Sequence, residues 1–324
     1  YEMQRSLVGS EMCIRDSLGG DVGKISFSSK AVDDYIFHLA MTADGDFKGM
    51  KIALDCANGS ASVTARALFT RLGAKCCIIN ETPNGTNINE NCGSTHLEQL
   101  QKFVVENKCD IGFAFDGDAD RLLVVDENGE VVDGDKIIAV CSKFMKENNK
   151  LKNNTAVVTV MSNMGFFKFC EKNGINCVKT KVGDRYVLEE MVKNGYAIGG
   201  EQSGHIIFLD YATTGDGQMS AIQVLNVLKS TGKKISELAS EMQVYPQVLI
   251  NVRVSNFGKA RLDKDEEVQL AIREASEKLG DTGRVLVRVS GTEPLARVML
   301  EGEDYNQIKS LAESIAKVIE ERLV

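Results

Sequence analysis

Short apolar runs alternate with segments of helical periodicity, and this alternation limits the possible folds more than any other feature. Residues 51–55 (KIALD) and 76–80 (CCIIN) are typical of buried strands, and apolar positions recur at helical spacing across residues 63–72 between them. A strand–helix–strand unit of this kind forms a parallel sheet with a right-handed crossover. The pattern therefore predicts an α/β fold.

The same pattern occurs again further along the chain. Two apolar strands are expected at residues 111–115 (IGFAF) and 122–126 (LLVVD). After them, a strand at 156–161, a helix at 166–172 and a strand at 177–180 repeat the first unit. This repetition predicts tandem related α/β domains with mainly parallel sheets.

The C-terminal part has a different pattern, with strands expected at residues 247–255, 284–290 and 296–301 between two helices. We therefore predict a smaller C-terminal α+β domain. The expected division is a lead-in helix and linker at 18–47, α/β domains at 48–130 and 131–243, and the α+β domain at 244–324.

The first 17 residues stand apart from this pattern. They contain neither the apolar segment of a secretory leader nor a clear amphipathic period. We interpret residues 1–17 as an artefact of expression or translation.

Composition excludes several classes of protein. The net charge of −8 and a pI near 5.2 argue against a general nucleic-acid binder, because such binding depends on basic surface. Nine cysteines without a CxxC pair do not resemble a secreted disulfide framework and favour a reducing compartment. No apolar run approaches the roughly 20 residues that a membrane span requires. We therefore expect a cytoplasmic protein that contacts neither nucleic acid nor membrane.

The most specific motif is DGDADR at residues 116–121, between two apolar strands. Asp116, Asp118 and Asp120 stand at alternate positions, so their carboxylates can converge on one hard cation, and oxygen-only ligation suits Mg²⁺. The adjacent Arg121 would face a phosphate bridged to that ion. An EF-hand fits poorly, because Arg121 stands where that loop requires glycine and strands flank the motif. The remaining alternative is a solvated acidic turn.

A second motif, GGEQSGH at residues 199–205, lies between two expected strands. Glu201, Ser203 and His205 stand two residues apart between glycines, a set suited to hydrogen bonding with the vicinal hydroxyls of a sugar. The alternative for His205 is a structural role in capping the turn.

The third motif is RVSGTEP, which begins at Arg288 and is followed by Arg297. Backbone N–H groups around Ser290, Gly291 and Thr292 can form an anion nest, and a guanidinium can hold a phosphate with two hydrogen bonds. The motif predicts a phosphate clamp, and its alternative is an ordinary loop joining two strands.

Two further loops are weaker indicators. Residues 180–185 (TKVGDR) place cations, among them Arg185, after a strand end, where they could hold substrate or form a salt-bridged surface turn. Residues 55–59 (DCANG) are more typical of a structural turn. Cys56 has no evident histidine or cation partner that would make it a nucleophile.

Taken in order, DGDADR, KVGDR, GGEQSGH with TTGDG (213–217), and RVSGTEP resemble the α-D-phosphohexomutase superfamily. Within it, the stretch GGEQSGHIIFLDYATTGDG is similar to the phosphoglucosamine mutase family, and the resemblance runs from about Val22 to the end. It implies a fold of three related α/β domains and a C-terminal domain around a central cleft. The first domain is absent here, so the resemblance implies an N-terminally truncated chain.

The resemblance also implies roles for individual residues. Asp116, Asp118 and Asp120 would bind Mg²⁺, and Arg121 would take a catalytic position beside the phosphoserine. The substrate-binding residues would be Glu201 and Ser203 at the sugar hydroxyls, His205 in support of that loop, Arg288, Ser290, Gly291 and Thr292 at the phosphate, and Arg185 and Arg297 as further contacts.

The activity implied by the resemblance is conversion of glucosamine 6-phosphate to glucosamine 1-phosphate, through a phosphoserine and a bisphosphate intermediate. This step lies on the bacterial route to UDP-N-acetylglucosamine and peptidoglycan. No Ser-His-Asn-Pro-like loop occurs in the sequence, so we predict that this chain alone does not turn over. The other hypothesis is a non-catalytic sugar-phosphate-binding module. A missing domain would also expose apolar surface and favour self-association.

Overall fold

The computed structural model describes residues 23–290 and 293–324. The chain divides into two units between residues 35 and 36; the first is described from residue 23, and the second comprises residues 36–324. Helix α2 (Ala31–Ala40), the expected lead-in helix, begins in the first unit and ends in the second. The interpretation of residues 1–17 as an artefact concerns a segment outside the described residues.

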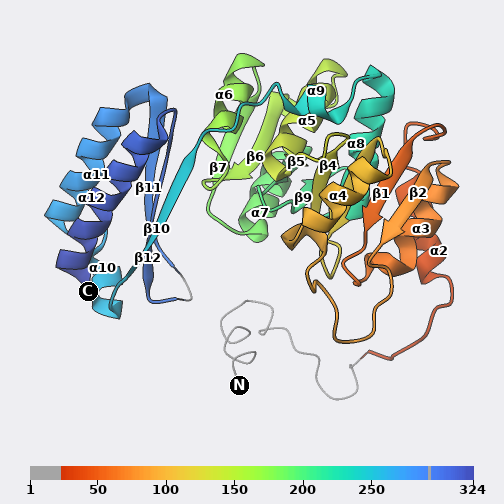
Figure 1. Cartoon of the computed structure of the whole chain (residues 1–324), viewed down its shortest axis with the longest axis horizontal. Coiled ribbons are helices and arrows are strands. Elements are labelled where there is room, and N and C mark those ends of the chain that lie inside the picture. The colour runs from red at the N-terminus through yellow and green to blue at the C-terminus, as the bar shows by residue number, and fades with distance from the viewer. Residues whose placement is uncertain (1–22, 291–292) are drawn as a thin grey trace. The chain divides into compact units, whose positions relative to one another are not determined.

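The first sheet has five strands in the order β2-β1-β3-β4-β5 (Figure 1). Strand β1 pairs in parallel with β2 and β3, whereas β3, β4 and β5 pair antiparallel. Strand β3 is buried along its whole length, because helices pack against the sheet. The elements are β1 (Lys51–Asp55), α3 (Ala61–Arg71), β2 (Lys75–Ile79), a 3₁₀ turn (Gly93–Thr95), α4 (Glu98–Glu106), β3 (Ile111–Phe115), β4 (Leu122–Asp126) and β5 (Val131–Val132).

The second sheet has the order β7-β6-β8-β9, with β6 paired in parallel to β7 and β8 and an antiparallel edge strand β9. Strand β6 is fully buried, since α5 and α7 both pack against it. The elements are α5 (Gly134–Glu147), a 3₁₀ turn (Lys152–Asn154), β6 (Thr155–Thr159), α6 (Met164–Lys172), β7 (Asn176–Thr180), α7 (Asp184–Asn194), β8 (Ile198–Gly200) and β9 (Ile206–Phe208).

Helix α8 (Gly217–Thr231) joins the two sheets. It follows the second sheet in the chain and contacts β9, but it also contacts β3 and β4 of the first sheet. The buried side chains of Thr64 in α3 and Gln218 in α8 exchange hydrogen bonds across this junction. The short helix α9 (Ile235–Ala239) then leads toward the C-terminal domain.

The C-terminal domain is an antiparallel sheet, β10-β12-β11, against which α11 and α12 pack side by side (Figure 1). Asp265 and Asp304 cap these two helices by accepting hydrogen bonds from backbone N–H groups of the first turn. The elements are β10 (Gln247–Arg253), α10 (Asn256–Arg261), α11 (Glu266–Leu279), a 3₁₀ turn (Gly280–Thr282), β11 (Gly283–Val289), β12 (Leu295–Gly302) and α12 (Tyr305–Leu323).

A buried ion pair connects this domain to the second sheet. Arg284 in β11 donates to Glu301 in β12 at 2.6 Å, and it also donates to the carbonyl of Val160 at 3.1 Å. Glu301 accepts a further hydrogen bond from the backbone N–H of Met164 at 2.9 Å. Burial raises the pKa of Glu301, while Arg284 acts in the opposite direction. Arg284 and Glu301 therefore bind each other within the C-terminal domain and also bind the backbone of Val160 and Met164, next to the second sheet.

The predicted fold class is confirmed: two α/β sheets in tandem are followed by a smaller α+β domain. The sequence did not predict α7 or α8. Helix α7 begins at Asp184, inside the segment interpreted as a loop at 180–185. Helix α8 is buried over most of its length, so it lacks the polar face that makes helical periodicity visible. Within the described ranges, no helix is both long and apolar enough to cross a membrane.

Candidate functional site

The acidic loop, residues 116–121, is the turn of the antiparallel hairpin between β3 and β4. Two apolar strands of five residues each flank a run of Asp, Gly and Ala, and Asp and Gly favour turns. Carboxylate oxygens of Asp116, Asp118 and Asp120 lie within 4.8 Å of one another. Three hard oxygen ligands at this spacing fit a divalent cation of the Mg²⁺ type.

The negative charge of the acidic loop is only partly compensated by the protein. Asp116 is 7% exposed, and burial, with the nearby carboxylates of Asp120 and Asp118, raises its pKa to about 6. The Nε atom of Arg121 lies 3.8 Å from Asp116 and 3.9 Å from Asp120. Oδ1 of Asp120 is buried without a hydrogen-bond partner among the described residues. A bound cation would satisfy this oxygen and offset the clustered charge.

The GGEQSGH loop, residues 199–205, packs directly against the acidic loop. Arg121 and His205 form an antiparallel bridge, and the N–H of Leu122 donates to the carbonyl of Gly204 at 3.0 Å. Gly204 has φ +96°, and a Cβ there would lie 2.3 Å from the carbonyl oxygen of Leu122. Glycine is therefore required at this position both by conformation and by the close approach of the two loops.

His205, a residue only 5% exposed, connects three segments through its imidazole ring. Its Nε2 accepts a hydrogen bond from the N–H of Gly215 at 3.1 Å, so the ring proton is on Nδ1. Nδ1 lies 3.1 Å from Oδ2 of Asp120 and donates to it. One oxygen of Asp120 is thereby held by His205, while the other is left for a ligand.

Other predicted residues of the GGEQSGH loop lie in different environments. Glu201 accepts a hydrogen bond from the N–H of Gly183 at 3.1 Å, so the segment at 180–185 also reaches this loop. Ser203 is exposed and able to meet a ligand. Arg185 lies in the first turn of α7, with its side chain 74% exposed and its Nε donating to Glu189 at 2.7 Å.

We use the name arginine clamp for the predicted phosphate-binding residues Arg288, Ser290, Gly291, Thr292 and Arg297. Of the described ones, Arg288 lies in β11, Ser290 directly follows that strand, and Arg297 lies in β12. Arg288 and Arg297 are directly opposite each other in the two strands. Burial lowers the pKa of Arg288, and the like charge of Arg297 lowers it further. Nε of Arg297 is buried without a hydrogen-bond partner among the described residues, although its Nη2 donates to Glu293 at 2.7 Å. Such a pair of partly buried cations favours an anion.

Ser290 is buried at the end of β11, and its contacts shape the turn. Its hydroxyl accepts a hydrogen bond from the N–H of Glu293 at 3.2 Å, and its N–H donates to Leu295 at 2.8 Å. Nζ of Lys259 donates to the Ser290 carbonyl at 2.7 Å. Gly291 and Thr292, predicted as phosphate-binding residues, lie outside the described residues.

Three models of the phosphoglucomutase/phosphomannomutase family match the chain in tandem. Alpha/beta/alpha domain II matches residues 32–129, alpha/beta/alpha domain III matches 133–245, and the C-terminal domain matches 249–318. The phosphoglucosamine mutase of Acetivibrio thermocellus is 55% identical over 305 residues, which are 94% of this chain and 68% of that protein. The chain belongs to the phosphoglucosamine mutase family.

Another relative supports this assignment, and two solved structures share the fold. The phosphoglucosamine mutase of Clostridium novyi is 54% identical over 304 residues, covering 94% of this chain and 68% of that protein. The crystal structure of Aspergillus fumigatus N-acetylphosphoglucosamine mutase in complex with GlcNAc-6P and magnesium has a TM-score of 0.75 at 20% identity, covering 93% of this chain and 68% of that one. A phosphoglucomutase/phosphomannomutase family protein of Burkholderia thailandensis has a TM-score of 0.74 at 20% identity, with 90% and 65% covered.

These solved structures share the fold, and the chain spans about two thirds of the length of its relatives. Membership of the phosphoglucosamine mutase family places the chain among enzymes of the mutase type, which are intramolecular phosphotransferases.

Sequence reasoning missed two contacts of the candidate site. Gly215, in the TTGDG segment, donates to His205, and a Cβ there would lie 2.6 Å from the imidazole ring. The glycines of this segment, soon after the histidine in the sequence, could have indicated a close approach. The contact itself depends on the turn between β9 and α8. Lys259 gave no signal, because a single lysine in a short helix is ordinary.

The DCANG segment is structural, as the sequence suggested. Asp55 is buried and accepts hydrogen bonds from the N–H groups of Ala57 and Gly93 and from the side chain of Asn80. Burial raises the pKa of the Cys56 thiol to about 12, so it stays protonated at neutral pH and is a poor nucleophile.

Proposed function

We propose that this chain forms the metal-binding and sugar-phosphate-binding part of a phosphoglucosamine mutase, which converts glucosamine 6-phosphate to glucosamine 1-phosphate. The observation that carries the proposal is the link between the acidic loop and the GGEQSGH loop through the hydrogen bond from His205 to Asp120. This link joins a site suited to a cation with a loop suited to a sugar. It supports a function in which metal and sugar phosphate meet in one place.

In this proposal Mg²⁺ is held by the carboxylates of Asp116, Asp118 and Asp120. Two observations support it: the three carboxylates lie close together, and the buried Oδ1 of Asp120 has no hydrogen-bond partner among the described residues. Magnesium, when bound, offsets negative charge on the phosphoryl group being transferred. Arg121 lies beside the same carboxylates with a side chain 45% exposed, so its guanidinium can contact a phosphate there. His205 acts as a positioning residue that holds Asp120.

Glu201 and Ser203 bind sugar hydroxyls in this proposal. A carboxylate accepts from two vicinal hydroxyls, and the serine hydroxyl both donates and accepts. Glu201 is already oriented by the N–H of Gly183, which leaves its other oxygen for the ligand. Arg185 is an exposed contact at the edge of this region and contributes less than the buried groups.

The arginine clamp holds the phosphate that is not being transferred. Arg288 and Arg297 supply two guanidinium groups, and Ser290, Gly291 and Thr292 supply hydroxyl and backbone donors. A phosphate between the two arginines would neutralise their mutual repulsion. Because either end of a sugar bisphosphate presents a phosphate, the same clamp serves both orientations of the intermediate, and it contributes to the rate by positioning.

The chain alone is expected to bind without turnover, because its 324 residues contain no Ser-His-Asn-Pro-like loop to carry the phosphoryl group. The second candidate is a non-catalytic sugar-phosphate-binding module that uses the same loops. We further propose a cytoplasmic location, without nucleic-acid or membrane partners, and three domains at 48–130, 131–243 and 244–324.

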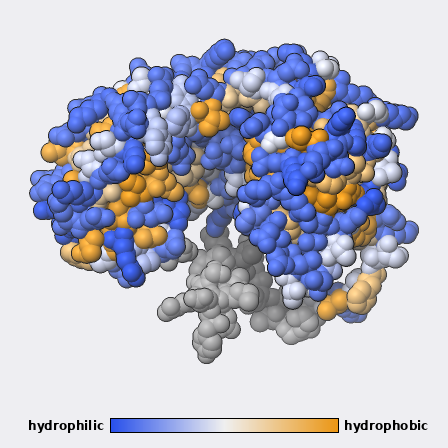
Figure 2. Space-filling view, in the orientation of Figure 1, coloured by the Kyte–Doolittle hydropathy of each residue, from blue (hydrophilic) through white to orange (hydrophobic). Residues whose placement is uncertain are grey.

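Self-association is the remaining part of the proposal. On the face shown in Figure 2, hydrophilic side chains predominate and hydrophobic ones appear in separate groups. Large apolar side chains of Phe37, Met41 and Val63 are more than half exposed. Sedimentation of the purified chain tests this: a concentration-dependent dimer supports association through such surface, and a monomer at all concentrations contradicts it.

The proposed function is tested by titrating the chain with glucosamine 6-phosphate, with and without Mg²⁺, beside a coupled mutase assay. Binding that weakens in Arg288→Gln, with no turnover, supports the proposal. A separately expressed phosphoserine domain from a relative is then added to distinguish the two candidates. Restored turnover identifies the chain as part of a mutase. Continued binding without turnover identifies it as a binding module. Absence of binding would contradict both.

A further inference from the structure

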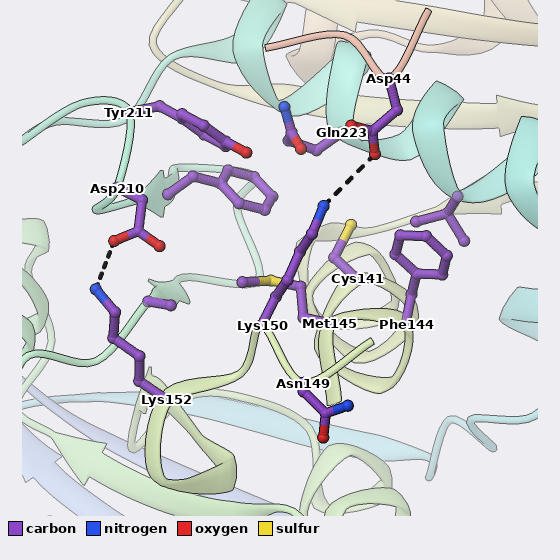
Figure 3. Close-up of a pocket in the computed structure, with 13 residues that line it drawn as sticks. Asp44, Cys141, Phe144, Met145, Asn149, Lys150, Lys152, Asp210, Tyr211 and Gln223 are labelled. Atoms are coloured by element: carbon purple, nitrogen blue, oxygen red, sulfur yellow. Dashed lines mark hydrogen bonds and ion pairs between the residues drawn. The ribbon is translucent and has the colours of Figure 1, made fainter. Parts of the chain in front are cut away.

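A cavity of about 250 Å³ lies apart from the candidate site. Helices α5 and α8, the edge strand β9 and the segment after α2 form its walls (Figure 3). No described residue that lines it belongs to the acidic loop, the GGEQSGH loop or the arginine clamp. It is therefore independent of the proposed function.

The inner surface of the cavity is apolar. Cys141, Ala197, Phe208 and Val227 line it and are each less than 5% exposed. Pockets that bind small molecules are lined predominantly by apolar side chains with a few polar groups, and this lining is of that kind. Water is held weakly in such a space, whereas small aromatic molecules enter apolar cavities readily.

The charged groups at the rim of the cavity cancel in pairs. Nζ of Lys150 lies 3.7 Å from Asp44, and Nζ of Lys152 lies 2.5 Å from Asp210 (Figure 3). All four side chains are about half exposed, so they are at the mouth rather than the floor. A charged ligand would have to displace one of these partners, and an uncharged ligand would not.

Polar groups without charge lie at one side of the mouth. The phenol of Tyr211 and the amide of Gln223 point toward each other in Figure 3. Asp44 is held in place beside them, because its N–H donates to the side chain of Asn226 in α8 at 2.8 Å. The wall formed by the segment after α2 is thus attached to α8. Hydrogen-bonding groups therefore lie along one edge of an apolar space.

We propose that this cavity binds a small uncharged aromatic molecule with a hydrogen-bonding group on one edge. An apolar cavity of about 150 Å³ accommodates benzene, so about 250 Å³ has room for two fused rings. Phe144 and Phe208 supply aromatic walls and Met145 a polarisable thioether, which favour a flat ring over an aliphatic chain.

The test uses indole as the probe and ¹³C-methyl methionine NMR of the full chain as the readout. The methyl signal of Met145, assigned with Met145→Leu, should shift saturably with indole. Val227→Phe places a ring in the cavity and should weaken binding at least about tenfold, because it fills the volume that the probe needs. The matched control is Val192→Phe on the exposed face of α7, which should bind indole as the wild type does.

Each outcome decides the proposal. No saturable shift of the Met145 signal up to the solubility limit of indole overturns it, and so does equal binding by Val227→Phe. Cys141→Leu is a second filling variant if Val227→Phe does not fold, and it should weaken binding in the same way. Indole-3-carboxylate tests the charge of the ligand: weaker binding than indole is expected, and tighter binding would overturn the assignment to an uncharged class.

Discussion

The acidic loop and the arginine clamp collect charge of opposite sign, and the protein compensates them differently. Asp120 has a buried partner in His205, 85 positions along the chain, and the backbones of the two loops are bridged. Arg288 faces another arginine, and buried Nε of Arg297 has no partner within the described residues. We therefore expect the proposed metal side of the site to be organised before ligand binds, and Arg288 on the proposed phosphate side to gain its counter-charge from the ligand.

The largest expected effect is on the metal side. Asp120→Asn should weaken Mg²⁺ binding by more than about a hundredfold, since loss of an outer-shell partner alone costs roughly 10–100-fold. Isothermal titration with Mg²⁺ measures this, with the exposed Asp281→Asn as the matched control. Unchanged affinity in Asp120→Asn would remove the acidic loop as the metal site.

The second prediction breaks the link between the loops. His205→Phe removes both hydrogen bonds of the ring and should lower Mg²⁺ affinity roughly 10–100-fold. His205→Asn keeps a donor near the position of Nδ1 and should retain most of the affinity. The control is His96→Asn on the exposed surface. Equal affinities for all three variants would mean that His205 only fills space.

The third prediction concerns the clamp. Arg288→Gln should weaken glucosamine 6-phosphate binding roughly 10–100-fold, because it removes a charged hydrogen-bond donor to phosphate. The free chain should not lose stability, since the variant also removes repulsion with Arg297. Calorimetric titration and thermal unfolding measure the two effects, with exposed Arg273→Gln as control. A large loss of stability would assign Arg288 a structural role instead.

The fourth prediction is that pH affects ligand binding at the acidic loop but not at the arginine clamp. The pKa of Asp116 is raised to about 6 in the metal-free chain, so protons compete with Mg²⁺ below that pH and affinity should fall about tenfold per unit. A raised folded-state pKa also means that the metal-free chain loses stability as pH rises from about 4 to 6. Thermal unfolding with and without Mg²⁺ measures this. Binding of glucose 6-sulfate to the clamp should stay constant, because neither arginine nor sulfate titrates there.

The smallest effect is expected at the edge of the clamp. Glu293 holds Nη2 of Arg297 and competes with phosphate for it. Glu293→Gln should strengthen glucosamine 6-phosphate binding by up to about fivefold, because an exposed ion pair is worth at most about 1 kcal/mol. Glu267→Gln, which breaks an exposed pair with Arg322, is the control and should change nothing. Weaker binding in Glu293→Gln would show that Glu293 orients Arg297.

Local sequence predicted strands better than helices in this protein. The strands at 51–55, 111–115 and 122–126 match β1, β3 and β4 residue for residue, because short apolar runs bounded by turn-forming residues leave little choice of boundary. Helix α8 was missed because tertiary contacts with both sheets bury most of it. Helix α7 was missed because its first turn, with Asp184 and Arg185, was interpreted as a charged loop.

The sequence by itself determined the three motifs that are predicted to carry the chemistry: an acidic loop between two strands, a glycine-flanked Glu-Ser-His loop and a segment that begins at Arg288. These follow from residue types within a few positions of one another. Tertiary structure alone decided that His205 holds Asp120, that Gly215 holds His205, and that Arg288 faces Arg297. Such pairings depend on sheet register and on close approach of loops distant along the chain, and no local pattern of residues encodes them.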